Sequence, residues 1–152
     1  MRGRAKLELT VQAARRALRP HANYRCLHRW ARSALLRDAV LTLRFVSRQE
    51  ARRLNRSFRG GDYAGNVLTF NYGTNSCDDC GEPIRADIVI CMPVVAKQAA
   101  AQHKSIEHHL AHMVTHGVLH AQGWDHVGRD QAARMEALEA RLLRRWRIAN
   151  PY

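Results

Sequence analysis

The sequence has no long apolar run. A helix that spans a bilayer needs about 18 or more consecutive apolar residues, whereas the longest run here covers residues 88–96 and contains Pro93. The N-terminus begins basic but lacks the apolar segment that a secretory signal requires. We therefore expect no membrane association and a cytoplasmic location.

Internal repeats and low-complexity linkers are also absent. The chain has 152 residues, 46% of them hydrophobic, which is enough for one compact domain with its own core. This composition excludes disordered and fibrous classes. We predict a single domain over residues 1–152.

Acidic residues are scarce in the first part of the chain. Residues 1–59 hold 16 Lys and Arg against three acidic residues, a balance of +13, whereas residues 60–152 have a balance of −1. Such asymmetry favours a polyanionic partner, most often a nucleic acid, and nothing in it points to DNA specifically. The alternative is an arginine-rich composition spread over solvated surfaces.

The cysteine pattern is too sparse for a structural zinc site. Cys77 and Cys80 form a CxxC pair in a polar stretch, but no second pair completes the ligand set. Cys26 and Cys91 are isolated, and disulfides are not expected in a cytosolic chain. The pair is interpreted as an incidental turn, with metal binding or redox sensitivity as the alternative.

Alternating and helical apolar patterns predict four strands and five helices. The strands are expected at residues 6–11, 40–46, 66–72 and 86–91. The helices are expected at about residues 20–35, 48–59, 93–104, 105–123 and 129–146. This order predicts an α+β domain with one mixed four-stranded sheet packed with about five helices.

Three of these helices have apolar residues along one face, and we expect the second and third of these stripes to be buried. The three stripes are Tyr24, Leu27, Ala31 and Leu35; Ala51, Leu54 and Phe58; and Met135, Leu138, Leu142 and Trp146. The middle helix opens with a capping-box pattern, Ser47 to Glu50, and ends at Gly60. Its other face carries a row of arginines: Arg48, Arg52, Arg56 and Arg59.

The strongest chemical signal lies between His116 and His126. Residues four apart on a helix share one face, so His116 and His120 can direct two imidazoles at one ion. Gly123 permits a sharp exit from the helix, after which His126 can supply a third ligand. Three protein ligands leave a fourth position open, as in catalytic zinc sites. We predict one zinc ion per chain.

The neighbouring residues refine this prediction. The HxxxHxxGxxH spacing also fits zinc proteases, but these need a general-base Glu directly after the first histidine, where this chain has Gly117. Asp125 is predicted to orient a ligand or accept a proton, with capping of the turn as an equal alternative. One and two turns before His116, His112 is expected to support the ligands and His108 to lie at the surface.

These motifs resemble the YbeY family of bacterial rRNA-maturation endoribonucleases. Residues 116–126 satisfy the family pattern HGxLHxxGxDH. Residues 54–62 (LNRSFRGGD), 66–70 (NVLTF) and 86–91 (ADIVIC) match three further motifs in the same order. The chain departs from the usual family sequence mainly at Asn66, where the family has Asp, at Ala86 in place of Gly, at Asn71 in place of Pro, and in a longer CxxC loop.

The resemblance implies that His116, His120 and His126 hold zinc and that Arg59 is the arginine needed for activity. It implies cleavage of single-stranded RNA in ribosomal RNA processing, notably at the small-subunit 3′ end, and ribosome quality control. The partners would be rRNA and the ribosome or its small-subunit proteins. Asn66 is expected to weaken any interaction that an Asp would make with a ligand or with Arg59.

Two other functions are compatible with the residues. One is a metal-dependent hydrolase of peptides or small molecules, which Gly117 and the basic first half disfavour. The other is a non-catalytic ribosome-assembly factor with a structural zinc, which the open fourth position disfavours. For Arg59, a cation that pairs with carbonyls at a helix C-terminus is the simpler alternative.

Overall fold

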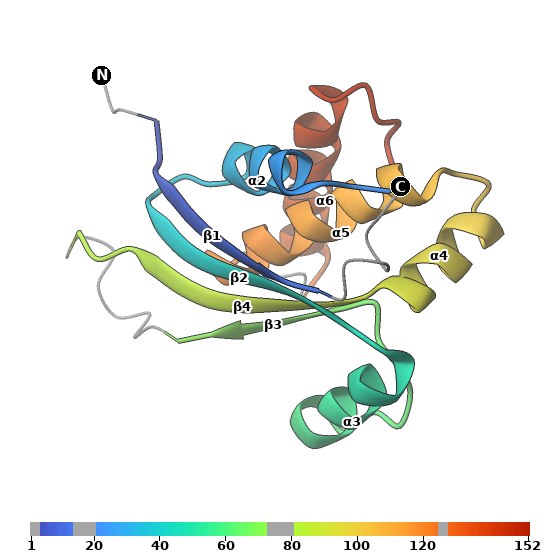
Figure 1. Cartoon of the computed structure of the whole chain (residues 1–152). Coiled ribbons are helices and arrows are strands. Elements are labelled where there is room, and N and C mark those ends of the chain that lie inside the picture. Colours follow the sequence, from blue (N-terminus) through green and yellow to red (C-terminus); the bar gives the residue numbers. More distant parts are fainter. Residues whose placement is uncertain (1–3, 14–20, 73–80, 125–127) are drawn as a thin grey trace.

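The structure is a computed structural model and describes residues 4–13, 21–72, 81–124 and 128–152 (Figure 1). Within them, one domain contains a four-stranded sheet and five helices. The strands are β1 (Leu7–Gln12), β2 (Ala39–Val46), β3 (Val67–Asn71) and β4 (Ile84–Cys91). The helices are α2 (Tyr24–Ser33), α3 (Arg48–Arg59), α4 (Met92–Ala101), α5 (Ile106–Ala121) and α6 (Arg129–Arg144). The predicted α+β class is confirmed.

The sheet is mixed, with the strand order β1-β2-β4-β3. β1, β2 and β4 run parallel to one another, and β3 pairs antiparallel with β4. β3 is therefore an edge strand. None of the described helices is both long and apolar enough to cross a membrane.

The two faces of the sheet are covered by different helices. Because successive side chains on a strand point to opposite faces, Ile88 and Ile90 join the main core with α2, α5 and α6, whereas Val89 and Cys91 join a smaller cluster with residues of α3. Figure 1 shows α2, α5 and α6 on one side of the sheet and α3 on the other. The sheet therefore separates α3 from α5.

Gly117 lets α5 approach the sheet closely. A Cβ atom at this position would lie 2.6 Å from Cγ2 of Ile88 and 3.4 Å from Cγ2 of Val67. Ile88 is fully buried and β-branched, so it has little room to move. The residue after His116 thus faces the sheet, and a side chain there would be directed away from any site on the histidine face.

Gly117→Ala is expected to lower the free energy of unfolding by up to about 2 kcal/mol, because overpacking a core typically costs about 1–3 kcal/mol and alanine returns about 1 kcal/mol of helix propensity. Urea denaturation would measure the change. In an Ile88→Ala background, which removes the contacted Cγ2, the same substitution should cost little. An equal cost in both backgrounds would contradict this explanation.

The predicted burial of Phe58 is wrong, and Tyr24 on the apolar face of α2 is exposed as well. Tyr24 is 53% exposed, although its hydroxyl donates to the carbonyl of Leu9 at 3.0 Å. Phe58 is 65% exposed, and its ring packs edge-to-face against that of Phe70 at a centroid distance of 4.9 Å. Both residues lie at the end of a helix, Tyr24 in the first turn of α2 and Phe58 in the last turn of α3.

The helix ends follow local capping. α2 begins after Asn23, whose side chain accepts from the backbone N–H of Cys26 at 2.9 Å; Pro20, the predicted start, lies outside the described residues. Ser47 caps α3, but the carboxylate of Glu50 pairs with Arg44 instead of completing the capping box. α6 ends at Arg144, so Trp146 packs from beyond the helix.

Candidate metal centre

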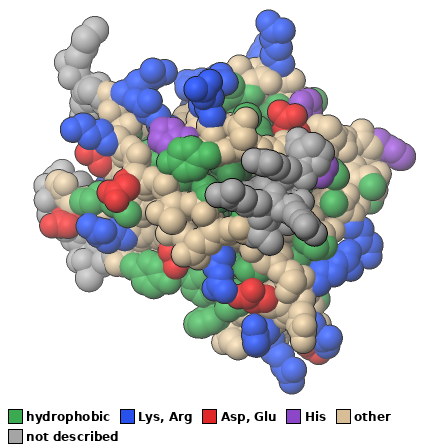
Figure 2. Space-filling view, viewed as in Figure 1, with side chains coloured by type: hydrophobic (Ala, Val, Ile, Leu, Met, Phe, Trp, Pro, Cys, Tyr) green, Lys and Arg blue, Asp and Glu red, His purple; other side chains and the backbone are tan. Residues whose placement is uncertain are grey.

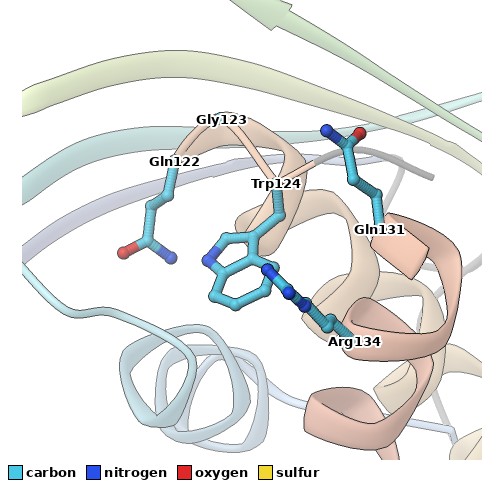
Figure 3. Close-up of a pocket in the computed structure, with 5 residues that line it drawn as sticks. All are labelled: Gln122, Gly123, Trp124, Gln131 and Arg134. Atoms are coloured by element: carbon cyan, nitrogen blue, oxygen red, sulfur yellow. The ribbon is translucent and has the colours of Figure 1, made fainter. Parts of the chain in front are cut away.

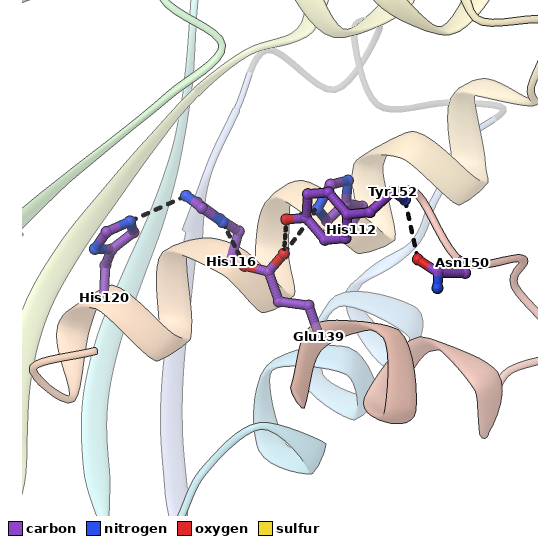
Figure 4. Close-up of polar contacts among 6 residues, drawn as sticks. All are labelled: His112, His116, His120, Glu139, Asn150 and Tyr152. Carbon is purple, nitrogen blue, oxygen red and sulfur yellow. Dashed lines mark hydrogen bonds and ion pairs between the residues drawn. The ribbon is translucent and has the colours of Figure 1, made fainter. Parts of the chain in front are cut away.

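α5 carries a row of histidines one helical turn apart. Ser105 is the N-cap of the helix, and its side chain accepts from the backbone N–H of His108 at 3.1 Å. His112, His116 and His120 then lie on one face (Figure 4). Most other residues of α5 are buried. The core therefore holds this histidine face in a fixed position.

The structure brings two predicted ligands together. Nε2 of His116 and Nε2 of His120 lie 3.0 Å apart, and both side chains are half-buried. Two nitrogens bound to one tetrahedral zinc at about 2.0–2.1 Å would be about 3.3 Å apart. The two imidazoles therefore need only a small adjustment to share an ion, and this donor pair fits a metal.

The helix ends just beyond this pair with a sharp turn. Gly123 has φ +91°, its N–H donates to the carbonyl of His120 at 3.0 Å, and the N–H of Trp124 donates to the carbonyl of Leu119 at 3.1 Å. These two bonds form a Schellman ending. The predicted exit at Gly123 is confirmed, whereas Asp125 and His126 lie outside the described residues.

Glu139 of α6 is the residue of this centre that sequence reasoning missed. Its side chain is completely buried, and its Oε1 atom accepts from Nδ1 of His116. Its Oε2 atom accepts from Nε2 of His112 at 3.0 Å and from the hydroxyl of Tyr152. Figure 4 shows all three donors directed at the one carboxylate.

A signal for Glu139 was present in the sequence. Met135, Leu138 and Leu142 define the inner face of the last helix, and Glu139 falls on that same face by helical spacing. A charged residue at a core position needs hydrogen-bonding partners. Those partners lie on another helix and on the C-terminal segment, so their identity could not be read from the local pattern.

The surroundings of Glu139 keep its carboxylate ionised. Burial acts to raise its pKa, but the hydrogen bonds from His112, His116 and Tyr152, together with the electrostatic attraction of His116, outweigh burial and lower the pKa to about 2. Burial, together with the adjacent carboxylate of Glu139, raises the pKa of Tyr152 above its usual value. The tyrosine hydroxyl therefore keeps its proton and donates to Glu139.

Two overlapping groups of metal-ligating atoms share His116. In addition to the His116–His120 pair, His112, His116 and Glu139 place ligand-type atoms within 4.8 Å of one another and form a candidate metal site. His112 was predicted to support the ligands, and its ring contacts Glu139. His108, predicted to lie at the surface, is half-buried.

Arg59 lies apart from the histidine face. It is the last residue of α3, on the opposite side of the sheet from α5, and it is exposed (Figure 1). Arg48 and Arg56 are exposed as well, whereas both Nε and Nη2 of Arg52 donate to Asp62, at 2.9 and 3.0 Å. Figure 2 shows Lys and Arg side chains projecting around α3 and from several other parts of this face.

Asn66 has local partners that do not include Arg59. Its Oδ1 atom accepts from the N–H of Val67 at 2.7 Å, and its Nδ2 atom donates to Oε1 of Gln98 at 3.1 Å. The same Gln98 oxygen is 2.9 Å from Nε2 of His109, whose pKa burial lowers to about 4. Among the described residues, the side chain of Asn66 therefore makes no hydrogen bond with Arg59.

A hollow of about 520 Å³ adjoins the turn that follows the histidines. It is lined by Gln122, Gly123, Trp124, Gln131 and Arg134. Figure 3 shows the indole of Trp124 and the side chain of Arg134 extending toward each other. Aromatic and guanidinium groups of this kind can stack on nucleic-acid bases. Cys77 and Cys80 lie outside the described residues.

Comparison with known proteins finds one family. A family model described as "Endoribonuclease YbeY" matches residues 10–147. Proteins called "Endoribonuclease YbeY" from Aromatoleum aromaticum and from a Janthinobacterium species are each 47% identical to the chain. These matches cover 97% of this chain, and 94% and 95% of the respective relatives.

Two further matches differ in extent. A protein of the same description from Cupriavidus metallidurans is 51% identical over 126 residues, and the match spans 83% of this chain but 62% of that longer protein. The solution structure of a Thermotoga maritima protein matches with a TM-score of 0.53 and 22% identity, over 93% of this chain and 91% of the other. This second likeness supports the fold alone.

Proposed function

The chain belongs to the YbeY endoribonuclease family, and we propose that it is a zinc-dependent endoribonuclease that cleaves single-stranded RNA during ribosomal RNA processing. The observation that carries the proposal is the pairing of His116 and His120, at 3.0 Å between their Nε2 atoms, beside the buried carboxylate of Glu139. The finer parts of the proposal are maturation of the small-subunit 3′ end and ribosome quality control. They imply rRNA and the ribosome as partners, and the cytoplasm as location.

We assign the zinc ligands as His116, His120 and His126. Neutral imidazoles suit zinc and leave the ion's charge uncompensated, which favours an anionic substrate such as a phosphodiester. When bound, zinc would supply a Lewis acid that polarises a phosphoryl oxygen and activates water. Asp125, next to the third ligand, is proposed to orient a ligand or to accept a proton.

The packing of Gly117 supports a nuclease over a peptide hydrolase. A protease with this ligand spacing needs its general base at this position. In this chain the position packs directly against Ile88, which leaves no room for a side chain. A general base at position 117 is therefore excluded by the close packing of α5 on the sheet as well as by the identity of the residue.

The arginines of α3 support binding of a single RNA strand. Arg48, Arg56 and Arg59 are exposed and can contact successive phosphates. β3 is the edge strand of the sheet, and α3 and α5 lie on opposite faces of that sheet (Figure 1). A single-stranded RNA held by α3 can therefore pass around β3 to reach the histidine face. Arg59 would assist cleavage by holding a phosphate and balancing its charge.

Cleavage of a defined RNA tests the proposal. We expect the purified chain to cut a single-stranded rRNA fragment, to spare the same sequence in a duplex, to lose activity in a chelator and to regain it with added zinc. Mapping of the product ends identifies the nucleophile, since a 2′,3′-cyclic phosphate means attack by the RNA's own 2′-hydroxyl. Equal cleavage of both substrates, or full activity in the chelator, would contradict the proposal.

A further inference from the structure

We propose that Glu139 is a positioning residue for the metal centre. Its carboxylate holds His116 with the proton on Nδ1, so that the lone pair of Nε2 faces His120 and the shared ion. Tyr152 and His112 in turn hold the carboxylate. This inference rests on the proposed zinc site and assigns a separate role to each residue of the two overlapping ligand groups.

The tautomer of His116 follows from its hydrogen bond. Oε1 of Glu139 accepts in its contact with Nδ1 of His116, so the proton of this hydrogen bond lies on Nδ1. In a neutral imidazole the other nitrogen then carries a lone pair. That nitrogen is Nε2, which lies 3.0 Å from Nε2 of His120. The carboxylate thus fixes which nitrogen of His116 is available to a metal.

The hydrogen bonds of Glu139 disfavour a role as a ligand. Oε1 is engaged by His116, and Oε2 is engaged by both His112 and Tyr152. Direct coordination would require the fully buried carboxylate to release at least one of these donors, and a buried donor left unpaired is costly. Carboxylates that accept from a metal-bound histidine commonly orient the ring and raise its basicity.

Tyr152 reaches this network from the segment that follows α6. Tyr152 as a whole is 56% exposed, yet its hydroxyl contacts Glu139 and lies 3.2 Å from Nε2 of His112. Its backbone N–H donates to Oδ1 of Asn150 at 2.9 Å, a local bond within this segment. The hydroxyl therefore contributes a donor that a phenylalanine of the same shape would lack.

The test compares Glu139→Gln with wild type and with Glu107→Gln, which makes the same charge change at an exposed position of α5. We expect Glu139→Gln to weaken zinc binding by about 10–100-fold, measured by competition with a chromophoric chelator, while circular dichroism shows the wild-type fold. Tyr152→Phe should weaken it by less, and Glu107→Gln should leave it unchanged.

A second measurement needs no metal. In the metal-free protein, ¹⁵N NMR of His116 should show the Nδ1–H tautomer in wild type and a mixture of tautomers in Glu139→Gln. An unchanged tautomer together with unchanged zinc affinity would overturn the inference. Loss of zinc as complete as in His120→Ala would also overturn it, because it would make Glu139 a ligand.

The two proposals fail in different ways. If the wild-type chain binds no zinc, the proposed function fails, and the tautomer of His116 still decides whether Glu139 controls this ring. If wild type binds zinc and cleaves RNA while Glu139→Gln matches it in affinity and tautomer, the proposed function stands and the positioning role is wrong.

Discussion

His120→Ala should lose bound zinc and RNA cleavage while keeping the fold. The substitution removes one of the two imidazoles whose Nε2 atoms meet at 3.0 Å. We expect the affinity to fall by more than the 10–100-fold that is typical for outer partners of a metal site. His120 is half-buried in the last turn of α5 and outside the main core cluster, so its loss should cost little stability.

Elemental analysis, chelator competition and cleavage assays on the same preparation would measure these effects. His108→Ala is the matched control, since it removes a histidine from the same helical row three turns earlier. It should keep zinc and activity. Wild-type zinc content in His120→Ala would instead favour the group of His112, His116 and Glu139 as the ligand set.

Arg59→Glu should reduce cleavage by at least about 100-fold, the loss typical when a group that stabilises developing charge is removed. Arg59 is exposed at the end of α3, where Gly60 turns the chain at φ +73°. Reversing its charge should therefore leave the fold and the zinc content unchanged. Single-turnover cleavage at saturating RNA, with zinc content measured in parallel, separates a chemical effect from weaker binding.

Arg53→Glu provides the control for charge. It makes the same change at an exposed position of α3 outside the proposed arginine face, and it should retain most of the cleavage rate at saturating RNA. If Arg59→Glu cleaves as fast as wild type, Arg59 serves only as a helix C-terminal cation. If both variants lose activity equally, the general positive charge of α3 matters and Arg59 has no special role.

Much of the candidate site could be predicted because it is local. The row of histidines on α5, the cap at Ser105 and the exit at Gly123 depend on helical periodicity and on side-chain bonds over three or four residues. The mixed sheet followed from the alternation of strand and helix patterns. These features need no knowledge of distant partners.

Other features could not be predicted because they depend on how elements pack. Nothing near Phe58 in the sequence indicates that its side chain is 65% exposed at the end of α3. The resemblance likewise does not reveal that Asn66 bonds to Gln98 and not to Arg59. Gly117 could be interpreted as a missing protease base, but its contact with Ile88 explains why a side chain is excluded there.

The sequence by itself determined that His116 and His120 share a helix face and that positive charge is concentrated in the first 59 residues, since spacing and composition need no tertiary contact. Only the tertiary structure brought Glu139 and Tyr152 to His116, because a buried carboxylate must find its donors wherever the chain supplies them. It also placed the arginine helix across the sheet from the histidines, because adjacent side chains of β4 point to opposite faces and each face recruits its own helix.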